Sequence, residues 1–211
     1  PTVYHLAGLA GVRQSVENPK KYYENNIIGT LNMLNIATKF SSQSFILASS
    51  SSIYGSQNNN KMPFIENETE ENPQSPYAFS KLFAEIVSKN YTNISSLNVS
   101  SLRFFTVYGP WGRPDMAIYM FCKAIFEGRT IPVFNNGDMK RDFTFIDDIV
   151  SGVIASLDKP PVSNNNQAPC RLYNIGNHCS EPLMRVIGLI EETLGKKAKI
   201  DFQPMQPGDL K

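Results

Sequence analysis

Short apolar runs alternate with longer amphipathic segments over the first half of the chain. Phe45–Ala48 is a continuous apolar run, as expected for a strand buried on both faces, and Val3–Ala7 and Val99–Phe105 are predicted as further short strands. Residues 19–38 and 76–91 carry helical spacing, and each begins with a proline, which suits a first helical turn. Since parallel strands are joined by such long crossovers, the pattern predicts an α/β fold with a doubly wound parallel sheet.

The pattern changes after Gly109-Pro110. The apolar runs become shorter and the helical segments are separated by Pro-rich and Asn-rich stretches. These shorter elements predict a smaller lobe, so we expect two domains, 1–109 and 110–211. The expected elements of the lobe are helices at 116–127, 147–157 (with Asp147 as its cap) and 182–194, and strands at 131–134, 172–175 and 200–202.

Charge and cysteine content exclude several classes of protein. The 211 residues include 20 Lys and Arg against 19 Asp and Glu, so no cationic field favours nucleic acid or a membrane surface. The three scattered cysteines are too few for a disulfide scaffold or a zinc quartet, and we expect a reducing, cytoplasmic location. No apolar run reaches the ~18 residues that a membrane span requires.

Tyr77 and Lys81 stand four residues apart at the start of the second predicted helix, which places them on one face. A neighbouring ammonium stabilises a phenolate, and a tyrosine needs its pKa of about 10 lowered by about 3 units to act as a base near neutrality. Tyr119 and Lys123 repeat this spacing inside an apolar helix, where we expect ordinary packing. The spacing alone therefore does not identify a catalytic pair.

A serine run, 49–52, directly follows the apolar run Phe45–Ala48. It would lie at the carboxyl end of a parallel strand, the edge at which α/β sheets bind ligands. By itself such a run is a turn or helix-capping element in most proteins. Followed by Tyr77 and Lys81 on the next helix, it predicts that a hydroxyl, a phenol and an ammonium meet at one edge of the sheet.

This combination resembles the extended short-chain dehydrogenase/reductase family, and within it the nucleotide-sugar 4-epimerases. The resemblance extends over nearly the whole chain, including His5–Arg13, Tyr22–Thr30 and Leu102–Pro110. It implies a Rossmann-like fold for 1–109, truncated at its N-terminus, and NAD as cofactor. It also implies a catalytic set of Ser50, Tyr77 and Lys81. The implied cofactor contacts are Ala7, Gly8, Asn25, Ser49, Tyr77, Lys81 and Phe104.

Residues 108–116 and 134–144 resemble the UDP-glucuronate 4-epimerases in particular. The resemblance implies conversion of UDP-glucuronate to UDP-galacturonate through a transient 4-keto sugar, with 110–211 as the incomplete UDP-sugar lobe. A 4-keto uronate is a β-keto acid that loses CO₂ readily, so its carboxylate must be restrained. The implied substrate contacts are Arg141 at the diphosphate, Val133 and Phe134 at the uracil, Gln206 and Asp209 at the ribose, and Ser51, Ser52, Thr106 and Arg113 at the carboxylate.

Other interpretations remain open for these residues. Arg141 could be a surface arginine paired with Asp142 or Asp147, and Arg113 could stack on Trp111. The protein could instead be a UDP-glucuronate decarboxylase or a 4-epimerase of a neutral UDP-sugar. Related decarboxylases tend to have Glu at the Ser52 position, and related dehydratases tend to have Asp-Glu at the positions of Ser51 and Ser52. A binding protein without activity is a further alternative, which the intact catalytic set disfavours.

The family's Gly-rich phosphate loop and the acidic residue after the second strand do not occur in this chain. We therefore expect a piece of a longer protein that binds NAD poorly or not at all when isolated. His5 is expected to be a hydrogen-bonded core residue, and no metal site is expected. We also expect a homodimer through the helices that begin near Pro19 and Pro76, as is common in the family.

Overall fold

The computed structural model describes residues 1–56, 63–67, 69–163 and 169–205. In chain order the elements are β1 (Thr2–His5), α1 (Val12–Glu17), α2 (Pro19–Tyr22), the π-helix η1 (Tyr23–Ile28), α3 (Gly29–Lys39), β2 (Ser44–Ser50), the 3₁₀-helix η2 (Ser51–Tyr54), α4 (Pro76–Ile94), β3 (Asn98–Phe104), β4 (Thr106–Tyr108), α5 (Ala117–Phe126), β5 (Thr130–Phe134), the 3₁₀-helix η4 (Asn135–Gly137), β6 (Lys140–Phe145), α6 (Ile146–Asp158), β7 (Cys170–Ile175), β8 (Ser180–Pro182), α7 (Leu183–Leu194) and β9 (Lys199–Gln203).

The chain forms two compact units. The first consists of Pro1–Phe105 and Ile149–Ile175, and the second of Thr106–Asp148 and the chain from Gly176 onward. This division differs from the expected split at 109 and 110, because β7 pairs with β3 and so returns the chain to the first unit.

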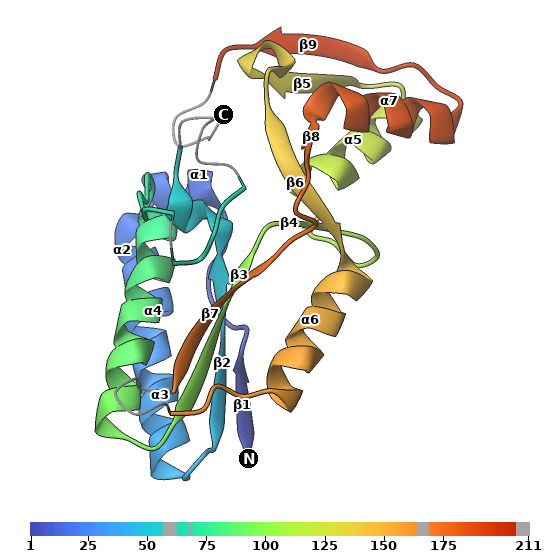
Figure 1. Ribbon diagram of the computed structural model, residues 1–211. Helices are drawn as coiled ribbons and strands as arrows, with labels where there is room; N and C mark the ends of the chain where they lie inside the picture. The colour runs from blue at the N-terminus through green and yellow to red at the C-terminus, as the bar shows by residue number, and fades with distance from the viewer. Residues whose placement is uncertain (57–62, 68, 164–168, 206–211) are drawn as a thin grey trace. The chain divides into compact units, whose positions relative to one another are not determined.

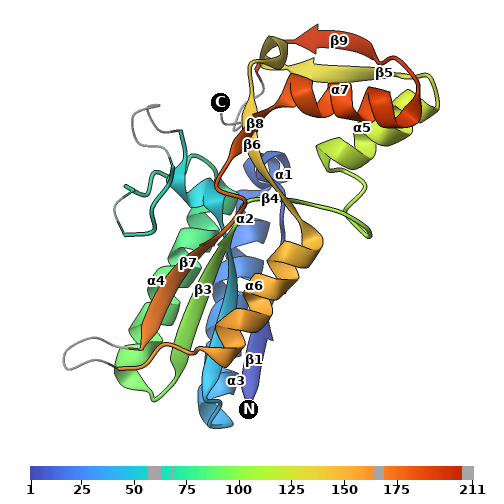
Figure 2. The same cartoon turned by 45° about the vertical axis from the view of Figure 1, so that its right-hand side comes forward.

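The first unit is built on a parallel sheet with the strand order β1-β2-β3-β7. Helices α3 and α4 cover one face and α6 lies against the other (Figures 1 and 2). Phe45, Leu47 and Val99 point into the core beneath α3 and α4 and are almost completely buried. The structure thus confirms the predicted doubly wound parallel sheet, with all carboxyl ends of its strands at one edge.

The helix predicted over residues 19–38 is present but irregular. It runs through α2, η1 and α3, with a π-helical segment in the middle. Every fourth residue faces inward through this segment, so Tyr22, Asn26, Thr30 and Leu34 are buried. The wider turn of a π-helix supports this four-residue repeat, and it places Asn26 rather than Asn25 beneath the sheet edge.

The second unit contains two small sheets. Strands β5 and β9 form a parallel pair covered by α5 and α7 (Figure 2), and their core includes Phe121, Ile131 and Ile187. Strand β6 pairs with β4 in parallel and with β8 in antiparallel orientation. The sequence pattern did not predict α1, β4, β6 or β8, because these elements are short and largely polar.

Helix α6 begins at Ile146, so Asp147 lies within its first turn and is not its cap as predicted. A carboxylate in a first turn still interacts favourably with the helix dipole. Among the described residues, no helix is both long and apolar enough to cross a membrane.

Candidate active site

Helix α4 presents one row of functional side chains, Tyr77, Lys81 and Glu85, at four-residue spacing. The helix begins with a defined cap: the Ser75 hydroxyl accepts a hydrogen bond from the Ala78 amide at 3.1 Å, and Pro76 occupies the first turn. This start fixes the position from which the Tyr77 side chain projects from the helix.

Lys81 is the buried member of the row. Its ammonium donates a 2.9 Å hydrogen bond to the carbonyl of Ala48 near the end of β2 and lies 6.0 Å from the centre of the Tyr77 ring. Burial lowers the pKa of Lys81 to about 8, although the charge of Glu85 acts in the opposite direction. The ammonium is thus held beside the phenol by the strand that carries the serine run.

Ser50 is the last residue of β2 and caps the 3₁₀-helix that follows. Its hydroxyl accepts hydrogen bonds from the Ser52 amide at 3.2 Å and from the Ser52 hydroxyl at 2.9 Å. A serine oxygen has two acceptor sites and one proton. Since Ser52 uses both acceptor sites, the Ser50 proton can be donated to a ligand.

The loop after β1 is held against α4 by Asn26. The Asn26 amide accepts from the Leu9 amide at 2.7 Å, and donates to the Leu9 carbonyl at 3.0 Å and the Ser80 hydroxyl at 2.9 Å. Gly8 has a φ of 152°, and a Cβ there would lie 3.0 Å from the Asn26 oxygen and 3.6 Å from the Lys81 nitrogen. A glycine is therefore required where this loop passes Lys81.

His5 is a core residue, as the sequence predicts. Its Nε2 lies 2.9 Å from the hydroxyl of Thr30, and burial together with the charge of Lys81 lowers the pKa of its imidazole. The described residues contain no group of three or more His, Cys, Asp or Glu side chains that could hold a metal ion.

The implied cofactor residues are not all brought to this edge in the same way. Ala7 and Gly8 follow β1, and Phe104 ends β3, so the topology places all three at the carboxyl edge of the sheet. Ser49 is buried and donates its hydroxyl to Glu85. Asn25 is exposed, and its amide donates to the Lys21 carbonyl at 2.8 Å. Asn26, the next residue of the π-helical segment, is the buried one, and the contact of Asn25 with the cofactor stays a prediction.

The implied substrate residues belong partly to each unit. Ser51 and Ser52 lie in η2 of the first unit, half-buried. In the second unit, Thr106 begins β4, Phe134 ends β5, and Val133 is fully buried in the core. The Val133 side chain packs inward, and its place beside the uracil stays a prediction. Gln206 and Asp209 lie outside the described residues.

The two candidate arginines lie in the second unit, and Arg113 pairs with Asp115 instead of stacking on Trp111. Arg113 forms two 2.9 Å hydrogen bonds to Asp115, while Trp111 is fully exposed. This pairing lowers the pKa of Asp115. Arg141 lies on β6 and donates to the carbonyl of Lys140 at 2.6 Å.

Three residues at the sheet edge were missed by sequence reasoning: Asn26, Glu85 and Arg103. Glu85 continues the row of Tyr77 and Lys81 by one turn, a signal that was available. Arg103 is a charged residue within an apolar strand run, and it is completely buried. A charge in such a run needs a buried partner, so this pattern could have been noticed.

Comparisons with known proteins agree with this geometry. Residues 1–176 match the model of the NAD dependent epimerase/dehydratase family. A probable UDP-glucuronate 4-epimerase of Rhizobium meliloti is 40% identical over 220 residues, covering 99% of this chain and 64% of the relative. UDP-glucuronate 4-epimerase 4 of Arabidopsis thaliana is 44% identical over 219 residues, covering 99% of this chain and 50% of the relative.

Among solved structures, the UDP-glucuronic acid 4-epimerase of Bacillus cereus, in complex with UDP-glucuronic acid and NAD, is 33% identical with a TM-score of 0.88. That alignment covers 99% of this chain and 64% of the other. The chain thus spans half to about two thirds of the length of these relatives. The family match and the mixed α/β fold lead to one conclusion: the chain belongs to the NAD dependent epimerase/dehydratase family.

Proposed function

We propose that the complete protein carrying this chain is an NAD-dependent 4-epimerase, an isomerase that interconverts UDP-glucuronate and UDP-galacturonate through a 4-keto sugar. The observation that carries the proposal is the convergence of Ser50, Tyr77 and Lys81 at the carboxyl edge of the parallel sheet. The names of the similar proteins support the choice of substrate.

The first unit fits the nicotinamide ribose half of NAD. Gly8 leaves open a position that a Cβ would crowd, and this position lies beside the Lys81 ammonium, a donor suited to ribose hydroxyls. When bound, NAD would supply hydride transfer, that is, the removal of the C4 hydrogen of the sugar as hydride and its later return. Tyr77 and Lys81, with Gly8 of the loop after β1, would hold it, while this chain contains no Gly-rich loop for its diphosphate.

Proton handling falls to the chain's own residues. The Tyr77 phenolate takes the proton of the sugar's 4-hydroxyl and later returns it to the 4-oxygen, acting as general base and then acid. Lys81 stabilises the phenolate through its positive charge. Ser50 donates its remaining proton to the same oxygen, which orients the sugar for transfer.

The substrate carboxylate needs a cation and hydroxyls to hold it away from the geometry that favours loss of CO₂. We infer that Ser51, Ser52, Thr106 and Arg113 serve this purpose, and that Arg141 binds the diphosphate. The Arg113–Asp115 pair is about half exposed, and such pairs contribute about 0–1 kcal/mol. Arg113 can therefore exchange Asp115 for a substrate carboxylate at low cost.

Proton NMR of UDP-glucuronate incubated with the complete protein, with a Tyr77→Phe variant as control, tests the proposal. We expect UDP-galacturonate from the parent protein without CO₂, and no product from the variant. UDP-xylose-type products would instead identify a decarboxylase. An unchanged spectrum, followed by turnover of UDP-glucose, would identify a neutral-sugar epimerase. Binding of UDP-sugars without any turnover would indicate a binding protein.

We also propose a homodimer through the irregular helix that begins at Pro19 (α2, η1 and α3) and through α4, which begins at Pro76. Tyr23, Phe79 and Phe83 are partly exposed and their rings lie in a chain, with centroids 5.9 and 6.2 Å apart. Ile28 in η1, Ile36 in α3 and Ile86 in α4 are about half exposed. An apolar patch of this kind favours a protein interface. A monomeric mass of the complete protein in light scattering would contradict this assembly.

A further inference from the structure

Arg103 is a completely buried charge directly behind the candidate site. It lies on β3, and its register partner in β2 is Ser49. Its guanidinium donates to both oxygens of Glu85, from Nε at 3.0 Å and from Nη2 at 2.7 Å, and also from Nη2 to Glu71 at 2.6 Å. It further lies 4.8 Å from the centre of the Tyr54 ring. An arginine in this setting is fixed by two carboxylates and an aromatic face.

The partners of Arg103 come from the segments that carry the candidate catalytic residues. Glu85 stands one turn after Lys81 on α4 and also accepts a hydrogen bond from Ser49, the neighbour of Ser50. Tyr54 ends the 3₁₀-helix that Ser50 caps, and its hydroxyl donates to Asn174 on β7 at 2.7 Å. One buried side chain thus joins the catalytic helix, the catalytic strand end and the turn that follows it.

This connection has a defined effect on geometry. Tyr77 and Lys81 are on α4, whereas Ser50 is on β2, so their separation depends on how α4 is seated against the strand. Lys81 donates across this seam to the Ala48 carbonyl, and one turn further along Ser49 donates to Glu85. Arg103 adds a charge-assisted attachment to the same carboxylate and so fixes the Glu85 end of the seam.

We propose that Arg103 is a positioning residue that, through Glu85 and Tyr54, fixes Tyr77 and Lys81 relative to Ser50. The proposal rests on the proposed function in that these three residues are taken as the catalytic set. Arg103 touches neither substrate nor cofactor in this role. It acts by holding three groups, from two elements, in the arrangement that proton transfer requires.

A stability effect must be separated from a positioning effect. Removing either Arg103 or Glu85 leaves the other as an unpaired buried charge, which destabilises a protein strongly. Removing both charges relieves this cost, and a neutral, well-packed replacement of a buried pair is often as stable as the original. The double variant Arg103→Met/Glu85→Gln therefore tests geometry with the stability cost largely removed.

The controls come from the same two elements. Ser101 on β3 and Ser88 on α4 are completely buried, and within the described chain their hydroxyls have no hydrogen-bond partner. Ser101→Ala and Ser88→Ala change a buried polar group at the same seam without touching the Arg103 contacts. Both variants should keep parent kcat and parent melting temperature.

The experiment compares melting temperature, kcat, KM and hydrogen exchange of residues 48–56 and 76–82 in the complete protein. We expect the double variant to melt near the parent temperature, with kcat lower by about 100-fold, KM little changed, and faster exchange in both segments. Recovery of both stability and kcat in the double variant would overturn the proposal.

Two further outcomes are decided by additional measurements. If the double variant does not fold, Arg103→Lys is measured instead, because lysine keeps the charge but loses the two-point geometry. We expect this variant to have a clearly lower kcat and a melting temperature close to that of the parent. A fall in kcat accompanied by an equally severe fall in melting temperature would overturn the proposal. If the parent protein itself turns over no UDP-sugar, the proposed function fails, while unchanged exchange of 48–56 and 76–82 in the variants would separately refute the positioning role.

Discussion

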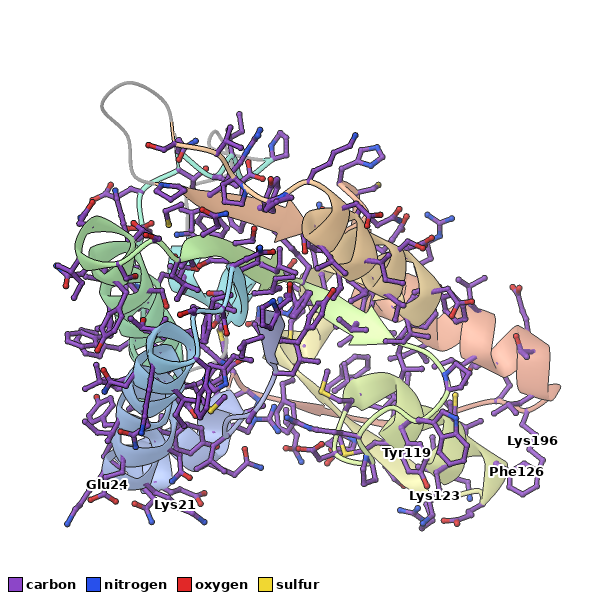
Figure 3. The ribbon with its side chains drawn as sticks, turned by 90° about the horizontal axis from the view of Figure 1, so that it is seen from below. Lys21, Glu24, Tyr119, Lys123, Phe126 and Lys196 are labelled. Carbon is purple, nitrogen blue, oxygen red and sulfur yellow. The ribbon has the colours of Figure 1, made fainter. Side chains whose placement is uncertain are left out.

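Two tyrosine–lysine pairs with identical spacing occupy very different surroundings in this molecule. On α4, Tyr77 is half-buried and Lys81 is buried, and a strand carbonyl holds its ammonium. On α5, Tyr119 is about half exposed and Lys123 is exposed, on the outward side of the helix (Figure 3). The helix supplies the same geometry to both pairs, so the chemical difference comes from what the helix packs against.

The surroundings of the α4 pair include the ends of three parallel strands and the loop after β1. Helix α5 instead packs its opposite face, including Phe121 and Ile125, on an apolar core. A lysine beside a sheet edge is desolvated and has a lowered pKa, whereas one on an outward face remains in water. Matched substitutions in the two pairs can separate these effects.

The largest difference should appear between Tyr77→Phe and Tyr119→Phe in the complete protein. Loss of a general acid–base group lowers the rate by about 10²–10⁴-fold, so we expect kcat to fall by about that factor for Tyr77→Phe. Tyr119→Phe should leave kcat unchanged. Equal kcat values for the two variants would contradict the assignment of the base.

The next effect concerns Lys81 and pH. Its pKa is lowered from 10.5 to about 8 by burial, so between these values the folded state binds fewer protons than the unfolded state. The free energy of unfolding therefore rises with pH in this window. We expect the parent to gain about 3 kcal/mol relative to Lys81→Met between pH 8 and 10.5, measured by urea unfolding.

Lys123→Met is the matched control for this pH dependence. Because Lys123 is exposed, its replacement should change the free energy of unfolding by less than about 0.5 kcal/mol. A Lys81→Met variant with the parent's slope would mean that Lys81 is not desolvated in solution.

A smaller effect distinguishes the adjacent residues Asn26 and Asn25. Asn26→Ala removes three hydrogen bonds that hold the loop after β1, and leaving such groups unsatisfied costs about 1–3 kcal/mol. Asn25 is exposed, and its replacement should change stability by less than about 0.5 kcal/mol. Thermal unfolding of both variants measures the difference, and a reversed order would contradict the π-helical register.

The smallest effect is expected from two glycines. Gly8→Ala places a methyl group in a conformation that costs a residue with a Cβ about 1–2 kcal/mol, next to Asn26 and Lys81. Gly188 lies in α7, and a Cβ there would meet no other side chain of the described residues within 4 Å. Gly188→Ala should therefore stabilise the helix by about 0.5–1 kcal/mol. If the melting temperatures of Gly8→Ala and Gly188→Ala shift in the same direction, the expected difference between the two glycines is wrong.

Most of the first unit could be predicted from the sequence because its strands are short, mainly apolar segments between long amphipathic helices. Burial on both faces makes such strands visible in the sequence, as at Phe45 and Val99. The convergence of Ser50 with Tyr77 and Lys81 was predictable for the same reason, since parallel strands end at one edge.

The remaining features depend on contacts that a periodic pattern does not contain. Asn26 rather than Asn25 faces inward because of one π-helical segment, which uniform helical spacing cannot indicate. Val133 alternates with exposed neighbours on β5, and its burial depends on the helices that cover that strand. The partners of Arg103 lie 18 and 32 residues away in sequence, so only the fold brings them together.

The pairing of β7 with β3 has a consequence for synthesis on the ribosome. Residues 106–148 are made after β3 and before β7, so the first unit's sheet lacks this strand while most of the second unit emerges. Asn174, which receives the hydroxyl of Tyr54, arrives with that last strand. The turn at Ser50 therefore obtains its final support late in translation, and a nascent chain stopped before residue 170 would hold the carboxyl end of β2 without it.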